Sequence, residues 1–354
     1  MSVESQNLSK PLVITQGDPA GIGSEIIVKA FRDAPDVTRG CFVVGDVATM
    51  RRAVQCVSEE GDLPIPVMRI EDAAEALRMP PRCIPVLQLP DMPAALVPFG
   101  QITREGGDAA AHCVIWAARA ALREEVAALV TAPLHKEALS LAGVSFPGHT
   151  ELLQAESAAF TGVGIADMPV RMMLANDALR TVLVSIHMSL RDAIDAVTFE
   201  NVLQTLRITH NALSKTLGRP PRMGVAGLNP HAGEGGLFGH EELEIIAPAV
   251  AAAQVEGIFA TGPFAPDTVF MRARSSVDKH GEFDVVIAMY HDQGLIPVKY
   301  LGVDSGVNVT LGLPLVRTSP DHGTAFDIAG SGIADAASLI ESIQVAKRLA
   351  NWNE

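Results

Sequence analysis

Short, continuous apolar runs recur along the chain, and longer segments with helical periodicity separate them. Residues 12–15, 127–131, 223–228 and 285–289 are such runs. Runs of four to eight residues rich in Val and Ile are typical of strands buried on both faces. Because helical segments follow these strands, the pattern predicts an α/β class with a mainly parallel sheet.

The same pattern predicts the other elements. Helices are expected over about 24–32, 47–57, 106–125, 198–217, 240–254 and 335–350, with a further helix beginning at 321–324. Residues 171–174 and 179–186 are expected to pair as strands around an Asn-Asp turn. The proline-rich segment 60–100 is expected to be irregular, with a possible strand at 84–89.

Length and composition favour a globular enzyme with two domains. The chain has 354 residues, more than one ordinary hydrophobic core organises. Hydrophobic residues make up 48% and charged residues 19%, which excludes a disordered chain.

Charge and segment patterns indicate a cytoplasmic protein. The net charge of −14 argues against a general nucleic-acid or anionic-membrane binder. No apolar run approaches the roughly 20 residues that span a bilayer, and the polar N-terminus lacks a signal-peptide pattern. The four cysteines show no CxxC pairing and are expected to be reduced thiols.

Three histidines share one setting, at or just past the end of an apolar strand: His187, His231 and His291. Ligands of open α/β sheets bind outside the carboxyl ends of strands. Three neutral imidazoles with an open position suit a catalytic divalent metal, with Zn favoured by nitrogen ligands. Their separations of 44 and 60 residues match no local metal motif, so each could instead be a hydrogen-bonded loop residue.

Two carboxylates and three long polar side chains accompany these histidines. Asp292 and Asp267 are candidates to orient the substrate or act as the base, although Asp267 could simply form a turn. Lys299, Asn308 and Arg317 follow within one short span, and Lys and Arg suit an anionic substrate.

Further anion-binding candidates lie in the first half of the chain. The turn at 17–23 resembles, without matching, a dinucleotide GxGxxG, and it could equally be a plain tight turn. His149 and Thr150 stand at the start of a predicted helix, where a polar residue is also ordinary. Lys136 is either a surface residue or an anion ligand.

Several motifs occur in order along the chain: GDPAGIG at 17–23, TAP at 131–133 with KE at 136–137, PGHTE at 147–151, GLNPHAGE at 227–234, YHDQG at 290–294, and RTS at 317–319 with DHGT at 321–324. Together they resemble the 4-hydroxythreonine-4-phosphate dehydrogenase family of pyridoxal phosphate biosynthesis. The resemblance covers about residues 11–350.

The resemblance implies an isocitrate/isopropylmalate-dehydrogenase-like fold with mainly parallel sheets and an inter-domain cleft. The first domain would comprise 1–145 plus about 310–354, and the second about 146–309, with much of the metal site and the interface of a homodimer. The family's metal ligands match His187, His231 and His291. Its substrate-binding positions match His149, Thr150, Lys299, Asn308 and Arg317, to which we add Lys136.

Family members use NAD or NADP without a Rossmann fingerprint, and we assign Gly227, Asn229, Gly233 and Glu234 to the cofactor. The divalent metal is expected to be Zn, with Mg, Mn or Co as alternatives. The implied reaction oxidises a secondary alcohol of a 4-phosphorylated hydroxy acid to a β-keto acid, and decarboxylation can follow.

Alternative functions stay open on the sequence. Relatives act on 4-phospho-threonate, 4-phospho-erythronate or a terephthalate cis-dihydrodiol, and the run at 321–328 resembles the phospho-sugar-acid branch. A metal-dependent hydrolase or decarboxylase that never uses NAD, and a non-catalytic ligand-binding module, are the competing classes.

Overall fold

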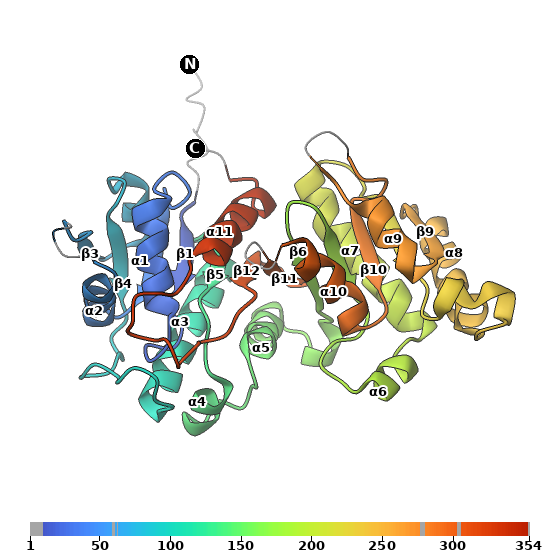
Figure 1. The fold of residues 1–354 in the computed structure, drawn as a ribbon. Coiled ribbons are helices and arrows are strands. Elements are labelled where there is room, and N and C mark those ends of the chain that lie inside the picture. Colours follow the sequence, from blue (N-terminus) through green and yellow to red (C-terminus); the bar gives the residue numbers. More distant parts are fainter. Residues whose placement is uncertain (1–9, 59–60, 62, 277–279, 303–305, 353–354) are drawn as a thin grey trace, which may run out of the picture. The chain divides into compact units, whose positions relative to one another are not determined.

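The computed structural model describes residues 10–58, 61, 63–276, 280–302 and 306–352 (Figure 1). Its contacts divide the chain into unit 1, Met1–Met168 with Leu313–Glu354, and unit 2, Pro169–Gly312. Each unit contains paired strands and helices that pack on them, so each is an α/β layer structure.

Unit 1 contains a parallel sheet with the strand order β3-β4-β2-β1-β5-β12. The strands are β1 (Leu12–Thr15), β2 (Cys41–Gly45), β3 (Val67–Ile70), β4 (Ile84–Gln88), β5 (Ala128–Thr131) and β12 (Arg317–Pro320). The helical segments are α1 (Gly23–Asp33), α2 (Val47–Val57), η1 (Ala73–Arg78), α3 (Arg104–Leu122), α4 (Lys136–Leu141), α5 (His149–Thr161), η2 (Ile165–Asp167) and α11 (Ala337–Leu349).

Both faces of this sheet are buried, which explains the continuous apolar strands. Leu12 and Ile14 pack into a core that contains side chains of α1, α2 and α11. Val13, between them, points to the other face and packs with α3 and α5. The sequence-predicted parallel α/β architecture is therefore confirmed for unit 1.

Polar side chains cap the starts of two helices in unit 1. The Asp46 carboxylate accepts a hydrogen bond from the Thr49 backbone N–H at 2.7 Å and begins α2. Thr103 caps α3 in the same way through Gly106, at 3.0 Å. Such caps satisfy backbone donors that the first helical turn leaves unpaired.

Unit 2 contains the strand order β11-β6-β7-β10-β8-β9. The strands are β6 (Arg171–Ala175), β7 (Arg180–Leu183), β8 (Met223–Ala226), β9 (Ala260–Phe264), β10 (Val285–Ala288) and β11 (Val307–Leu311). The helical segments are α6 (Leu190–Asp195), α7 (Phe199–Leu217), η3 (Pro230–Gly236), η4 (Glu242–Ile246), α8 (Ala247–Val255), α9 (Pro266–Ala273) and α10 (His291–Leu301).

Strands β7, β10, β8 and β9 run parallel, so their carboxyl ends lie at one edge of the sheet. Strand β6 runs antiparallel to both β7 and β11, and its pairing with β7 confirms the predicted hairpin around Asn176. Side chains of α9 and α10 pack with Leu183, Val286 and Ala288 in the core of this unit. The β10–α10 turn thereby delivers His291, the first residue of α10, to the carboxyl edge.

The predicted helix start at 321–324 is wrong. Residues 321–336 form a loop before α11. Ala325, Gly330 and Gly332 have positive φ angles, which a right-handed helix does not allow. The buried Glu25 carboxylate accepts hydrogen bonds from the Gly330 and Gly332 N–H groups, at 2.5 and 2.9 Å, and holds the loop.

Among the described residues, no helix is both long enough and apolar enough to cross a membrane.

Candidate functional site

A cavity of about 520 Å³ opens in unit 2 beyond the carboxyl ends of β7 and β10. Residues of the β7–α6 segment and of the β10–α10 turn line it: Ser185, Ile186, His187, Met188, Ser189, Leu190, Ala193, Tyr290, His291 and Asp292. Two of the three predicted metal ligands and one predicted catalytic carboxylate thus share one cavity.

His187 and His291 lie close together in this cavity. Their ring centroids are 5.7 Å apart, with the rings inclined by 42°. The Asp292 carboxylate lies 2.7 Å from His291 Nδ1. A carboxylate that holds one ring nitrogen fixes the ring's orientation and leaves the other nitrogen for a ligand.

A buried serine ties the two histidine-bearing segments to each other. Ser185 donates a hydrogen bond from Oγ to the Met289 carbonyl oxygen at 2.8 Å. Ser185 precedes His187 by two residues, and Met289 precedes His291 by two. The backbone positions of these histidines are therefore set by the pairing of β7 with β10 and by this hydrogen bond.

His231 lies in a turn with an unusual backbone. His231, Ala232 and Glu234 have φ angles of 53°, 53° and 44°, and Gly233 and Gly235 between and after them are also positive. For residues with a Cβ this left-handed conformation costs about 1–2 kcal/mol each. Such strain persists only where the surroundings impose it, and it is concentrated at functional sites.

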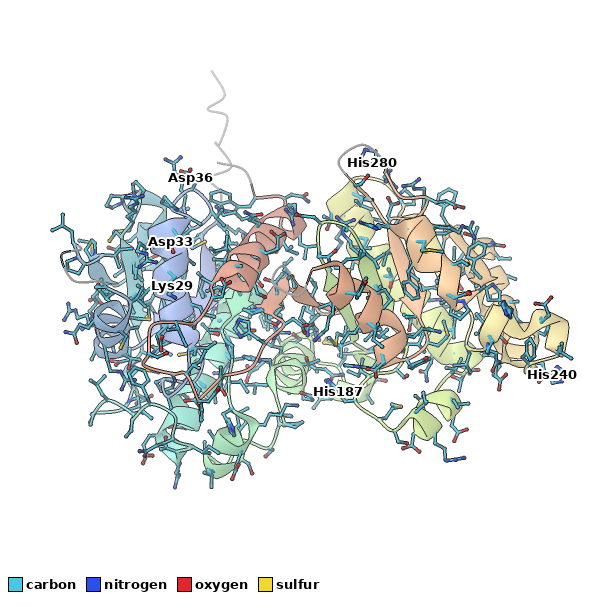
Figure 2. The ribbon with its side chains drawn as sticks, viewed as in Figure 1. Lys29, Asp33, Asp36, His187, His240 and His280 are labelled. Carbon is cyan, nitrogen blue, oxygen red and sulfur yellow. The ribbon has the colours of Figure 1, made fainter. Side chains whose placement is uncertain are left out.

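The chemistry of the donor set suits a divalent metal. Among the residues that the structure describes, no group of three His, Cys, Asp or Glu side chains is placed to hold an ion. The chemistry of His187 and His291 fits nevertheless, because imidazoles backed by a carboxylate are the arrangement found around Zn²⁺. Figure 2 shows His187 far from His240 and His280.

The other predicted residues of unit 2 are placed as follows. Asp267 is exposed in the first turn of α9. Lys299 lies in the last turn of α10, and Asn308 lies on β11 opposite Leu174. These are positions in one unit, and the catalytic and binding roles of the three residues stay predictions.

The structure explains why glycine stands at two of the predicted cofactor positions. A Cβ on Gly227 would lie 3.0 Å from Glu242 Oε1, and one on Gly233 would lie 2.8 Å from Oε2. The missing side chains therefore make room for a buried carboxylate. Asn229 bonds to the same carboxylate, and Glu234 is exposed in the left-handed turn.

In unit 1, Arg317 and Thr131 lie together on the neighbouring strands β12 and β5. The guanidinium donates to the Thr131 hydroxyl oxygen from Nε at 3.1 Å and from a terminal nitrogen at 2.7 Å. Arg317 is only 4% exposed. Burial lowers the pKa of Arg317 to about 10, while the Glu151 carboxylate opposes this shift. The group still carries its charge at neutral pH.

His149 begins α5, as predicted, and lies near this arginine. Burial first, and then the Arg317 charge, hold the pKa of His149 well below its ordinary value, although a hydrogen bond with the Ala132 backbone acts the other way. The imidazole is therefore neutral at pH 7. Its Nε2 is buried without a hydrogen-bond partner among the described residues.

Thr150 is half-buried in the first turn of the same helix. Lys136 is exposed at the start of α4. Its Cε would lie 4.0 Å from a Cβ built on Gly148, so this side chain reaches the residue before His149. Unit 1 thus contains four of the predicted binding residues: Lys136, His149, Thr150 and Arg317. The Lys136 side chain reaches the start of α5, where His149 and Thr150 lie.

Sequence reasoning missed Asp18 and His135. Asp18 is 1% exposed, and its Oδ2 has no partner among the described residues. Burial raises the pKa of Asp18. The hydrogen bond from the Ala20 N–H and the nearby His135 act in the opposite direction but are smaller. His135 stacks on Phe326 with ring centroids 4.8 Å apart. Both residues follow strand ends, so the rule that selected the other histidines could have found them.

Comparison with known proteins assigns the chain to a family. The profile of the family described as pyridoxal phosphate biosynthetic protein PdxA matches residues 38–346. The chain belongs to this family.

Individual PdxA relatives align over nearly their whole length. A 4-hydroxythreonine-4-phosphate dehydrogenase of Beijerinckia indica is 49% identical over 97% of this chain and 96% of its own. A D-threonate 4-phosphate dehydrogenase of Salmonella typhimurium is 44% identical over 97% of this chain and 99% of its own. The crystal structure of a Klebsiella pneumoniae 4-hydroxythreonine-4-phosphate dehydrogenase aligns with a TM-score of 0.84 at 42% identity, covering 97% of this chain and all of that one.

These comparisons confirm the family and the α/β fold that the sequence motifs predicted. They also establish that the PdxA chain described here belongs to a family of dehydrogenases.

Proposed function

We propose that this PdxA protein oxidises the secondary alcohol of a 4-phosphorylated hydroxy acid to a β-keto acid, using NAD or NADP and a divalent metal. One observation carries the proposal. The rings of His187 and His291 have centroids 5.7 Å apart in a cavity at the strand ends, and the Asp292 carboxylate contacts His291 Nδ1. Decarboxylation can follow, because a β-keto acid loses CO2 once its developing enolate is stabilised.

His187, His291 and His231 would hold the metal, and Zn²⁺ is favoured over Mg²⁺, Mn²⁺ or Co²⁺ by three nitrogen donors. A bound divalent ion supplies Lewis acidity that lowers the pKa of an alcohol. Asp292 orients the His291 ring. Either Asp292 or Asp267 receives the hydroxyl proton, and both are exposed enough to exchange it with water.

The phosphate and carboxylate of the substrate require cationic and hydrogen-bonding groups. In unit 1, Arg317 supplies a fixed charge, and the neutral His149 offers an unpartnered ring nitrogen. Thr150 and Lys136 lie in the same part of the unit. Lys299 and Asn308 are the binding residues that we propose from unit 2.

For the nicotinamide cofactor we keep Gly227, Asn229, Gly233 and Glu234 as the proposed contacts. Their turn lies at the carboxyl edge of the unit 2 sheet, where ligands of such sheets bind. The choice between NAD and NADP is tested by the ratio of kcat/KM for the two cofactors.

We also propose that the protein works as a homodimer. Exposed apolar side chains flank the cavity, and Met188, Leu190 and Ile194 are 48%, 60% and 43% exposed. A second copy that covered this face would bury them. Sedimentation analysis of wild type and Leu190→Asp tests this, since a charged side chain at the interface weakens the dimer.

A substrate panel tests the proposed reaction. The purified protein is incubated with Zn²⁺, Mn²⁺ or Mg²⁺, with NAD⁺ or NADP⁺, and with 4-hydroxythreonine 4-phosphate, D-threonate 4-phosphate, D-erythronate 4-phosphate or a cis-dihydrodiol. Growth of the reduced-nicotinamide absorbance with a phosphorylated substrate supports the proposal. The second candidate is D-threonate 4-phosphate oxidation, favoured by the 44% identity to the Salmonella relative of that name.

Two outcomes of the panel would contradict the proposal. Turnover of the cis-dihydrodiol alone would assign the protein to a different branch. Metal-dependent product formation without any reduced nicotinamide would indicate a hydrolase or decarboxylase, and binding without turnover would indicate a non-catalytic module.

A further inference from the structure

We propose that Glu242 and Gln293 are positioning residues that hold the left-handed turn of His231 in place beside the turn of His291. This inference rests on the proposed metal site and adds two residues outside the ligand set. Both act through hydrogen bonds to backbone, at a distance from the reacting atoms.

Glu242 anchors the start of the His231 turn. It is 2% exposed, and its Oε1 accepts hydrogen bonds from the backbone N–H groups of Leu228 and Asn229, both at 2.7 Å. Its Oε2 accepts a third bond from Asn229 Nδ2 at 3.0 Å. Three hydrogen bonds therefore end on this one buried side chain.

The backbone around Glu242 is shaped for this contact. Glu242 begins η4, a single π-helical turn at the head of α8, and such turns are frequent at functional sites. Gly227 and Gly233 lie on either side of His231 in the sequence. Because they lack a Cβ, they leave the space that the two carboxylate oxygens of Glu242 occupy. One carboxylate therefore determines both where the turn begins and how closely it folds back.

Gln293 joins this turn to the one that bears His291. Its Nε2 donates to the Gly227 carbonyl oxygen at 2.8 Å, and its Oε1 accepts from the Met289 N–H at 2.7 Å. Gln293 follows His291 by two residues, and Gly227 immediately precedes the first N–H that Glu242 holds. The chain of contacts thus runs from the His291 turn through Gln293, Gly227 and Glu242 to the His231 turn.

This arrangement predicts a specific effect on metal affinity. A ligand held by a strained backbone relaxes when its supports are removed, because the left-handed conformation is not favoured locally. Loss of supporting hydrogen bonds around metal ligands typically weakens metal binding by about 10–100-fold. We expect this range for Glu242→Gln and for Gln293→Met.

The variants are chosen to change hydrogen bonding with little change of volume. A glutamine at 242 has one acceptor oxygen, whereas the three donors contact both oxygens of Glu242. Glu25→Gln is the matched control, because Glu25 is also fully buried and also accepts two backbone N–H groups, but in unit 1. Its zinc affinity should equal that of wild type.

The measurement is the zinc dissociation constant, by competition with a chromogenic chelator, together with amide hydrogen exchange of residues 227–237 in the metal-free protein. We expect weaker zinc binding and faster exchange at 228 and 229 in Glu242→Gln, and neither in Glu25→Gln. Zinc affinity within about twofold of wild type, with only a lower unfolding temperature, would overturn the positioning role.

Failure of the proposed metal site is distinguishable from failure of this inference. If wild type binds no divalent ion, and His187→Ala and His231→Ala change nothing, the metal assignment fails. The positioning role of Glu242 and Gln293 is then tested by amide hydrogen exchange alone. It would be overturned if the amides of 228 and 229 stayed protected from exchange in both Glu242→Gln and Gln293→Met.

Discussion

Arg317 and Thr131 are joined by two hydrogen bonds that end on one hydroxyl oxygen, at 3.1 and 2.7 Å. The contact links β12 to β5, strands that are 186 residues apart in sequence. A buried guanidinium fixed in this way is pre-organised for an anionic substrate, because little side-chain entropy remains to be lost on binding.

Replacing Arg317 should therefore impair phosphorylated substrates selectively. For Arg317→Lys we expect kcat/KM to fall by roughly 30–100-fold, since a lysine cannot reproduce the planar, multiply bonded contact. The matched control is Arg171→Lys. Arg171 lies on β6 and likewise donates a hydrogen bond to a threonine hydroxyl, that of Thr205, at 2.7 Å. Equal losses in the two variants would argue against a substrate role for Arg317.

Asp292 should support metal binding through His291. Asp292→Asn keeps the side-chain volume but removes the negative charge next to Nδ1, so zinc affinity should fall by about 10-fold or more. Asp108→Asn is the control, because Asp108 pairs with His112 on α3, at 3.8 Å, in the other unit. An unchanged zinc dissociation constant in Asp292→Asn would remove Asp292 from the metal site.

The depressed pKa of His149 makes a signed prediction for stability against pH. The unfolded chain takes up a proton near pH 6.5, and the folded chain does so only at a clearly lower pH. Stability from neutral His149 is thus complete above about pH 6.5 and is lost as the pH falls below it, by at most about 1.4 kcal/mol per pH unit.

His149→Asn removes this titration. In chemical denaturation at several pH values, wild type should lose stability relative to the variant as the pH falls from about 7 towards 5. A difference between the two proteins that stayed constant with pH, or changed in the opposite direction, would contradict neutral His149 in the folded state.

Asp284 should stabilise unit 2 through its arginine partners. Burial alone would raise its pKa, but hydrogen bonds from Arg219 and Arg222 hold the pKa of Asp284 well below its usual range. A lowered carboxyl pKa contributes stability above the unfolded value near 3.9 and loses it as the pH falls further.

Asp284→Asn should therefore lower the free energy of unfolding by roughly 1–2 kcal/mol at neutral pH, and by less below about pH 4. The loss is kept small because both arginine side chains are half-exposed and water screens their charges. The exposed Arg32–Asp33 pair provides the control, with Asp33 on α1 in Figure 2. Urea unfolding of Asp33→Asn should differ little from wild type, and a similar loss in both variants would refute the special role of Asp284.

Much of the secondary structure could be predicted from local pattern. The runs 12–15 and 285–289 are confirmed as β1 and β10, and the helix predicted at 47–57 is α2 to the residue. These elements have strong periodicity, apolar runs or a capping residue, all of which are local properties of the sequence.

Elements without such signals were missed or mistaken. Strands β3 and β9 and helix α9 were not predicted, because proline and glycine interrupt or adjoin them. The helix expected at 321–324 is a loop held by Glu25, about 300 residues earlier in the chain. A short local pattern cannot predict a hydrogen-bond partner as distant in the sequence as Glu25.

The sequence by itself determined the family, the α/β class and the placement of His187, His231 and His291 after strands, because apolar runs and ordered motifs are readable along one dimension. Only the tertiary structure decided that His187 faces His291, that His231 lies in a left-handed turn, and that Glu242 and Gln293 hold that turn. The physical reason is that these features depend on hydrogen bonds between side chains and distant backbone groups, which leave no periodic trace in the sequence.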